Sequence, residues 1–552
     1  MRPTRPTWPR LSRLLVVALL ILVAAVGVVR GVDLARHGWR PAAPGELRWL
    51  EWATGNPEER AVRAALADLS VGREPVVLKV FADGPVRADW CHVMAQYEWP
   101  ESRVLAVDVV GQSRSGPPPD ALPVAPPVVR EVVVKAREGV SEVGLEAPVE
   151  GSTVTILGLA LLAAGLWLFV RLQGEPDLAG KLADGVLLAT LALFDWKVLV
   201  APLWSWDHHA IWGMKARRLA ELARLGGVPG DWLAGPAFPY AATDYPLGWP
   251  WLLSLASPGG APGPWLFKSA HLLCGVALAL LVRETLLLGR ADRMAAATAG
   301  ALTAASPLFW DTESLGLADL PLATLAMVAL VSIVTVSVVA ASAGTTAPRW
   351  SLPVAGLALG GLPWIKQEGW SLAVGLLLAA ALLLGMHSGG VHPWKRLQKR
   401  LQHLQRLVPL ALPCLLSWVL QPWVHARFIA PATRFLAGDW QGRALERLPD
   451  LPSILGRMAV ELSSPAWLGL WGLFAVALGV ALVRRRQLAA LVGAVVVAQI
   501  GVYAAVYLAT YLDPSAHILS SFFRIAAALG PLAVVTVFLS LSSSAPDILK
   551  VR

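Results

Sequence analysis

Cysteine is scarce in this chain, which has 3 cysteines among 552 residues. Cys274 and Cys414 fall within long apolar runs, where a small apolar role is the default for a free cysteine. Only Cys91 is expected outside the apolar runs, in the long polar region between the first and the second run. One such cysteine excludes the disulfide framework that holds small secreted domains together.

Charged residues are also few, at 15% of the chain, whereas 56% of the residues are hydrophobic. This balance excludes an ordinary soluble globular protein. The sequence has no Gly-rich phosphate loop of the Walker or dinucleotide type. It also shows no internal repeat, which argues against a transporter built from inverted halves. The net charge of +9 requires no nucleic-acid partner, because the basic loops of a membrane protein account for much of it.

Apolar runs of about 17–25 residues recur along most of the chain, as helices that cross a bilayer require. The predicted fold class is therefore an all-α polytopic membrane protein with about twelve transmembrane helices. The predicted spans lie near residues 14–30, 153–171, 184–204, 264–288, 294–310, 319–341, 351–365, 369–386, 407–424, 466–483, 488–508 and 522–541.

Lysine and arginine in the short loops predict the orientation. The first 13 residues carry several arginines and no acid, so the N-terminus is expected in the cytoplasm. Alternate counting of the spans then puts the basic segments 394–406 and 484–486 and the C-terminus inside as well. No small-residue cleavage site follows the first apolar run, which favours an uncleaved signal anchor. The predicted location is the cell (plasma or inner) membrane.

Four regions follow from this reading: a basic N-terminus with an anchor helix (1–30), an exoplasmic region (31–152), a polytopic domain (153–541) and a cytoplasmic tail (542–552). In the exoplasmic region, EPVVLKVF from Glu74 and RVLAVDVV from Arg103 have the β-branched composition of strands, and EVVVKA from Glu131 is a third candidate. A helix is expected between the first two. The region is predicted to be a small α/β insertion with a structural or substrate-guiding role.

Five polar motifs interrupt the apolar segments, and the counting places all of them on the exoplasmic face. They are WDHHAIWGMKAR from Trp206, TDYPLG from Thr243, WDTESLGLADLP from Trp310, IKQEG from Ile365 and LDPSAHILSSFFR from Leu512. Acids, histidines and cations that meet at one membrane surface suit a reaction on a lipid-linked substrate. Because the cytoplasmic loops are too short for a nucleotide-binding domain, a lipid-borne donor is favoured over a cytosolic nucleotide sugar.

The first two motifs contribute acids and histidines. Asp207 follows directly on a predicted span, where a carboxylate can serve as a general base or simply cap the next helix. His208 is a candidate acceptor or metal contact, although adjacent residues such as His208 and His209 do not share a helix face. Asp244 is a candidate for acceptor binding or metal sharing, with a turn-forming role as the alternative.

The other motifs contribute one more acid and the cations. Asp319 stands at the head of a span, as a candidate acceptor or metal contact or as an ordinary helix start. Lys366 lies in a tight outer turn at the level of lipid phosphates. His517 and Arg524 share a helical face with Ser521, and a charge such as Arg524 near the hydrocarbon normally has a partner.

In this order, the motifs WDHHAIWGMKAR, DYPLG, LADLPLA, IKQEG and AHILSSFFR resemble those of the bacterial GT-C glycosyltransferases. These polytopic enzymes use polyprenyl-phosphate sugars and are related to protein mannosyltransferases and to the aminoarabinose transferase of lipid A. The resemblance covers roughly residues 184–541. It implies that Asp207 is the catalytic base or an acceptor-binding group, and that Asp319 or Asp311 is the acid of the second loop. His208 and His209 stand where an Asp-x-Asp pair would be, so no cofactor is certain and a divalent metal stays an open alternative.

The predicted reaction is transfer of a sugar from a polyprenyl-phosphate donor to a hydroxyl of a glycan, lipid or protein acceptor, with inversion. Asp207 takes the proton, and Lys366, Arg524 and His517 bind the lipid phosphate. Three alternatives stay open. They are a glycan polymerase or ligase acting on lipid-linked oligosaccharides, a transporter or flippase with Asp195 and Lys197 along its path, and a non-catalytic assembly protein.

Overall fold

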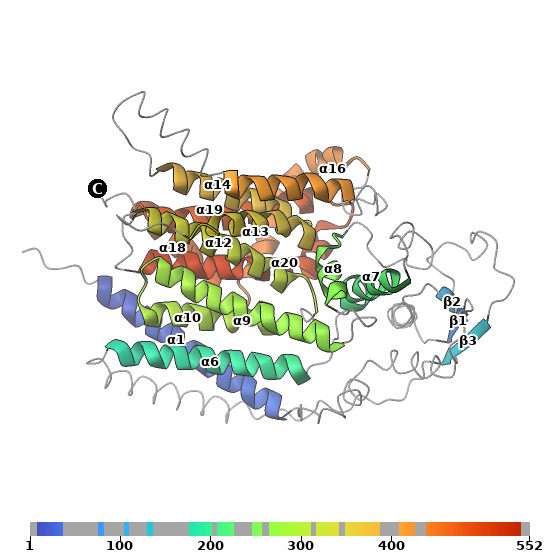
Figure 1. Ribbon diagram of the computed structural model, residues 1–552, viewed down its shortest axis with the longest axis horizontal. Coiled ribbons are helices and arrows are strands. Elements are labelled where there is room, and N and C mark those ends of the chain that lie inside the picture. The colour runs from blue at the N-terminus through green and yellow to red at the C-terminus, as the bar shows by residue number, and fades with distance from the viewer. Residues whose placement is uncertain are drawn as a thin grey trace, which may run out of the picture.

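The computed structural model describes residues 8–36, 76–81, 104–109, 130–135, 176–200, 207–225, 245–256, 264–310, 316–341, 348–386, 408–424 and 438–542. Most of these residues are helical, and the long helices run side by side (Figure 1).

Among the described residues, four helices are long and apolar enough to cross a membrane. They are α9 (Pro264–Leu288), α12 (Asp319–Ala341), α19 (Gln487–Ala509) and α20 (Pro514–Leu541). Shorter apolar helices accompany them: parts of α1 (Trp8–Arg36) and α14 (Gly369–Met386), together with α13 (Ser351–Ile365), the helix Val408–Val424 and α18 (Leu470–Val483). The chain is therefore a helical membrane protein.

Several predicted spans coincide with these helices, and others differ from them, among these one by a break and two by an earlier start. The predicted span 294–310 is interrupted, because α10 (Arg293–Ala304) ends before Ser306 and the short α11 (Pro307–Trp310) starts anew at a proline, which has no amide hydrogen to donate. The helices α6 (Pro176–Val200) and α20 each begin eight residues before their predicted starts at 184 and 522. The predicted span 153–171 lies outside the described residues, so the total of twelve spans stays a prediction.

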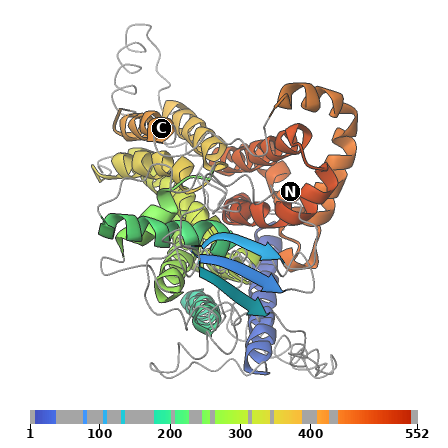
Figure 2. The same ribbon diagram turned by 90° about the vertical axis from the view of Figure 1, so that its right-hand side faces the viewer.

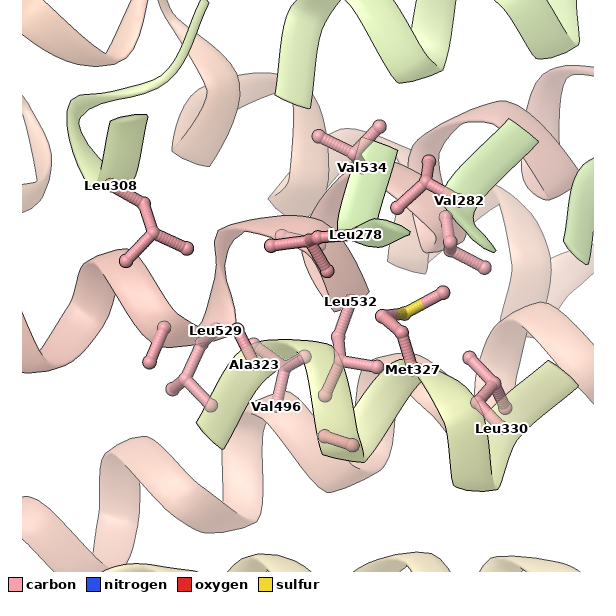
Figure 3. Close-up of a cluster of buried hydrophobic side chains, with 14 of the residues drawn as sticks. Leu278, Val282, Leu308, Ala323, Met327, Leu330, Val496, Leu529, Leu532 and Val534 are labelled. Atoms are coloured by element: carbon pink, nitrogen blue, oxygen red, sulfur yellow. The ribbon is translucent and has the colours of Figure 1, made fainter. Parts of the chain in front are cut away.

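The apolar core is centred on α20, which packs against α9, α10, α12, α18 and α19. Leucine, valine, alanine and methionine side chains from α9, α12, α19 and α20 meet there, with Leu278, Met327, Val496 and Leu532 among them (Figure 3). Because α20 is surrounded on most sides, a polar side chain on it is held in the interior of the bundle.

The outer surface of the bundle is also apolar. Large hydrophobic side chains such as Leu188, Leu273, Val419 and Val483 are exposed. Exposure of each such side chain to water instead of an apolar environment costs about 1.5–3 kcal/mol. Contact with the hydrocarbon of lipids removes this cost. This surface fits a lipid environment.

The bundle has two chemically different ends. At one end, Arg486, which precedes α19, donates to the carbonyl of Leu539 near the end of α20 at 3.1 Å. The same end holds an ion-pair network in which Asp184 of α6 binds Arg283 of α9 and Arg293 of α10 at 2.9 and 2.7 Å. We call it the basic end. The opposite end, where α19 stops and α20 starts, carries the polar motifs.

Short elements gather at that opposite end. They include η2 (His208–Trp212), α7 (Gly213–Leu225), α8 (Gly248–Leu255), α16 (Trp440–Glu446), η5 (Leu448–Asp450) and α17 (Leu451–Leu462), of which α7, α8 and α16 are labelled in Figure 1. Arg443 and Arg447 donate to the carbonyls of Ala509 and Thr510, at 3.2 and 2.6 Å, and so fix α16 to the loop between α19 and α20.

Three described strands form a small sheet. The strands β1 (Val76–Phe81), β2 (Val104–Val109) and β3 (Arg130–Lys135) pair in parallel in the order β2-β1-β3 (Figure 2). They lie within or next to the segments expected to be strands. Parallel pairing needs crossover connections, but the residues between the strands lie outside the described ones. The α/β insertion as a unit therefore stays a prediction.

Candidate functional site

A continuous chain of ion pairs joins residues from four distant segments at the end of the bundle opposite the basic end. Arg524 of α20 donates from Nη1 to Oδ2 of Asp207 at 2.6 Å, and its Nε lies 3.9 Å from Oδ2 of Asp319. Lys366 then binds Asp319 Oδ1 at 2.7 Å and lies 3.4 Å from Glu368 Oε1. The fold thus brings together four of the predicted site residues: Asp207, Asp319, Lys366 and Arg524.

Asp207 stands at the start of a stretch of π-helix, η2, an uncommon geometry that is often found at functional sites. Its side chain makes no capping hydrogen bond to η2, so the alternative reading as a helix cap does not describe it. The carboxylate instead binds Arg524 through one oxygen, and about a quarter of its surface is exposed (26%). Asp207 is therefore both held in place and accessible.

Asp319 and Lys366 form a fully enclosed pair, with side chains 2% and 3% exposed. Asp319 is the first residue of α12, as predicted for a helix start, but its carboxylate is bound by Lys366. Burial of the ammonium group opposes its charge, yet the Asp319 and Glu368 carboxylates outweigh this effect and hold the pKa of Lys366 above its usual value. Lys366 is thus a permanent positive charge at neutral pH.

A tight turn between α13 and α14 positions Lys366 and Glu368. Lys366 ends α13 in an extended conformation, and its carbonyl accepts from the amide of Gly369 at 3.0 Å. A Cβ atom at Gly369 would collide with the backbone of Leu362, so only glycine fits there. The turn is therefore built by close backbone packing as well as by its polar residues.

Tyr245 precedes α8. Its phenol feels the charges of Glu368, Lys366, Asp207 and Arg524. Burial raises the pKa of its phenol above the usual value, and the charge of Glu368 adds to the effect. Lys215 of α7 is fully buried and donates to the Tyr245 carbonyl at 3.1 Å, and Trp212 packs edge-on against the ring. The outer motifs at 206 and 243 are thus joined to each other as well as to the bundle.

Sequence reasoning missed a polar stripe on α19. Gln499, Tyr503 and Tyr507 are spaced four residues apart, lie on one helix face and are all buried. Gln499 donates to the Glu368 carbonyl at 3.5 Å. The signal was present in the sequence, because these are polar or amphipathic side chains at helical spacing in an otherwise apolar helix.

His208 is fully buried, and its Nδ1 lies 3.3 Å from the carbonyl oxygen of Gly316. Its ring packs edge-on against Phe267, with centroids 4.6 Å apart. Because Nδ1 faces a carbonyl, that nitrogen carries the proton in this arrangement. The contact ties the segment after α6 to the segment before α12, which places Asp207 and Asp319 near each other.

His517 occupies the first turn of α20, where its ring packs edge-on against Tyr507 at 5.1 Å. Its carbonyl accepts from Ser521 Oγ at 2.6 Å, and Tyr507 and Ser521 are 3.0 Å apart through their oxygens. The structure therefore joins His517 to the stripe on α19, one step removed from the ion-pair chain.

Two of the predicted acids of the outer loops, Asp244 and Asp311, lie outside the described residues. The side chain of His209 is also not described. Within the described ranges, no three His, Cys, Asp or Glu side chains are grouped closely enough to hold a metal ion.

Comparisons were made with protein-family models, with curated proteins and with solved structures. None of them found a match to this chain.

Proposed function

We propose that this protein transfers a sugar from a polyprenyl-phosphate-linked donor to an acceptor hydroxyl at the exoplasmic face of the membrane. The observation that carries the proposal is the chain of ion pairs Asp207–Arg524–Asp319–Lys366. Four segments far apart in the sequence contribute to it, and it combines an accessible carboxylate with two fixed cations at one end of an apolar bundle.

Asp207 is the proposed base. Its Oδ2 is bound by Arg524, which fixes the carboxylate and leaves Oδ1 to accept the proton of the acceptor hydroxyl. Attack of that hydroxyl on the anomeric carbon, from the side opposite the lipid phosphate, forms the new glycosidic bond and breaks the bond to the phosphate oxygen. One such displacement inverts the anomeric configuration.

Arg524 is the proposed direct partner of the leaving lipid phosphate, and the enclosed Lys366 contributes through the charge that it adds behind Arg524. Negative charge grows on that group as the bond breaks, and fixed cations that need not reorganise stabilise it best. Lys366 keeps its proton at neutral pH, so it serves as a fixed charge and not as a proton donor. Arg524, at 23% exposure, can meet a ligand without leaving Asp207, because a guanidinium has five N–H donors.

Arginines in the short α9–α10 and α18–α19 connections support an exoplasmic site at the other end of the bundle. Arg290, Arg293 and residues 484–486 lie at the basic end, at the other end of the roughly 34 Å long α19. Positive residues favour the cytoplasmic side of a membrane. The proposal therefore takes the ion-pair chain to lie on the exoplasmic side of the cell membrane, with both termini in the cytoplasm. A small α/β unit at 31–152 would lie on the same side and could guide a glycan, lipid or protein acceptor.

The decisive experiment replaces Asp207 by Asn in protein reconstituted into nanodiscs, with polyprenyl-phosphate sugars as donors and extracted envelope lipids and glycans as acceptors. Transfer should fall by about 10²–10⁴-fold, because general-base catalysis is lost while size and shape are kept. The matched control is Asp450→Asn, an exposed carboxylate at the same end of the bundle, which should transfer normally.

Mass spectrometry of envelope glycans from a deletion strain, complemented by wild type or by the Asp207 variant, identifies the product. Unchanged transfer by Asp207→Asn rules out the base. Transfer of whole oligosaccharides would identify a polymerase or ligase instead, and movement of donor across the bilayer without bond formation would identify a flippase.

A further inference from the structure

Glu368 has a different environment from the other acids of the ion-pair chain. Its Oε1 lies 3.4 Å from Lys366, whereas its Oε2 is shielded from solvent and has no hydrogen-bond partner among the described residues. An ionised carboxylate only accepts hydrogen bonds, and a buried acceptor left unsatisfied costs about 1–3 kcal/mol. Glu368 therefore has one oxygen with unused acceptor capacity, which the hydroxyl or amine of a ligand would satisfy.

The backbone of Glu368 is firmly held. Its carbonyl accepts from the amide of Leu372 at 3.3 Å, from Ser371 Oγ at 3.1 Å and from Gln499 at 3.5 Å. Two of these donors belong to the first turn of α14 and the third to α19. The carboxylate thus projects from a fixed point where two helices meet, which is the preorganisation that a recognition group requires.

Three tyrosines from two segments of the chain are near enough to this carboxylate for its charge to act on their phenol groups. They are Tyr245, Tyr503 and Tyr507. Among the charged groups that act on each phenol, Glu368 has the largest effect. Binding sites for small ligands combine apolar and aromatic walls with a few placed polar groups. Phenol rings and a carboxylate acceptor in one region suit a sugar, whose C–H faces pack on aromatic rings while its hydroxyls donate hydrogen bonds.

We propose that Glu368 is the sugar-recognising group of this site: its Oε2 accepts a hydrogen bond from a ring hydroxyl of the transferred sugar, while Gln499 positions it. This rests on the proposed sugar transfer and assigns a role distinct from those of Asp207, Lys366 and Arg524. It makes Glu368 a specificity-determining residue and Gln499 a positioning residue.

The test compares donors that differ by one hydroxyl. Farnesyl-phosphate hexoses and pentoses are first screened for binding to the Asp207→Asn protein, which cannot turn them over. The best donor is then compared with its analogues in which single hydroxyls are replaced by hydrogen. For wild-type protein and for Asp207→Asn, one such analogue should bind about 10- to 100-fold more weakly, as expected for loss of a hydrogen bond to a charged group.

Glu368→Gln should bind the parent donor about as weakly as wild type binds that analogue, and should no longer distinguish the two. Glu368→Asp keeps the charge but moves the carboxylate back by one methylene group, and it should lose discrimination in the same way. Agreement of the two variants shows that the loss is not caused by a folding defect of Glu368→Gln. Gln499→Leu should lower the discrimination ratio in part, a readout that a merely structural role would not move. The matched control, Glu446→Gln on the exposed face of α16, should keep full discrimination.

If both Glu368 variants still distinguish the parent donor from its analogue, the inference is overturned and the proposed sugar transfer is not. The same holds if the variants lose affinity equally for every donor. Absence of binding by any lipid-phosphate sugar overturns the proposed function and this inference with it. The two failures are therefore distinguishable.

Discussion

The enclosed pair of Lys366 and Asp319 makes a quantitative prediction about stability. At an effective dielectric constant of about 20, two unit charges 2.7 Å apart attract each other by about 6 kcal/mol. The desolvation of both ions offsets much of this attraction. Lys366→Met leaves Asp319 with Arg524 at 3.9 Å, where the attraction is about 4 kcal/mol. Loss of one partner of a buried pair usually costs 3–5 kcal/mol, so we expect about 3 kcal/mol here.

The double variant Lys366→Met/Asp319→Leu should be more stable than Lys366→Met alone, and within about 1 kcal/mol of wild type, because it removes both ions from the interior. Unfolding in mixed dodecylmaltoside and SDS micelles, followed by tryptophan fluorescence, measures these differences. Glu284→Gln is the control, since Glu284 is 53% exposed in its pair with Arg283, and an exposed pair contributes at most about 1 kcal/mol. A double variant as unstable as the sum of its single variants would refute the reasoning.

The sign of the pKa shift adds a condition on pH. The pKa of Lys366 is raised in the folded protein, so its stabilising contribution is fully present below the unfolded value of about 10.4. The contribution is lost only as the pH rises through the still higher folded value. The stability difference between wild type and Lys366→Met should thus be constant between about pH 6 and pH 9, and a decline within that window would show that Lys366 titrates there.

Two further predictions concern neighbouring residues. Arg524→Lys should lower transfer by at least about tenfold, because one ammonium group cannot bind Asp207 and approach Asp319 together as the planar guanidinium does; steady-state kinetics with unchanged rates would contradict this. Gly316→Ala should destabilise the protein by about 1–3 kcal/mol, since Gly316 has a φ of +82° and its Cβ would lie 2.5 Å from His208 Nδ1. Thermal unfolding in nanodiscs measures the stability of Gly316→Ala. An unchanged melting temperature would show that the His208 side chain moves aside without loss of stability.

Hydropathy alone predicted the helices well where the apolar run was long and bounded by polar residues. The span 264–288 and the helix α9 have the same limits, as do 319–341 and α12. The prediction was wrong between α10 and α11, where Ser306 and Pro307 break a helix that the hydropathy of 294–310 does not reveal. Average hydrophobicity over a window does not register one missing backbone donor.

The site residues illustrate a second limit. The motifs pointed to Asp207, Lys366 and Arg524, because charged side chains next to apolar spans are expensive unless they have partners. Their partners were not predictable, since Asp207 and Arg524 are 317 residues apart. Glu368 received no role, and the stripe on α19 was missed because glutamine and tyrosine in an apolar helix also suit an ordinary helix contact.

The sequence by itself determined the membrane class, the location of most described helices and the polar motifs between them, because apolar length and turn chemistry are local properties of the chain. Only the tertiary structure decided that Arg524 binds Asp207, that Lys366 is enclosed with Asp319, and that one carboxylate oxygen of Glu368 has no hydrogen-bond partner among the described residues. Those pairings depend on how each helix is rotated and how deep it sits against its neighbours. Side-chain packing across the whole bundle sets both, and no segment carries that information alone.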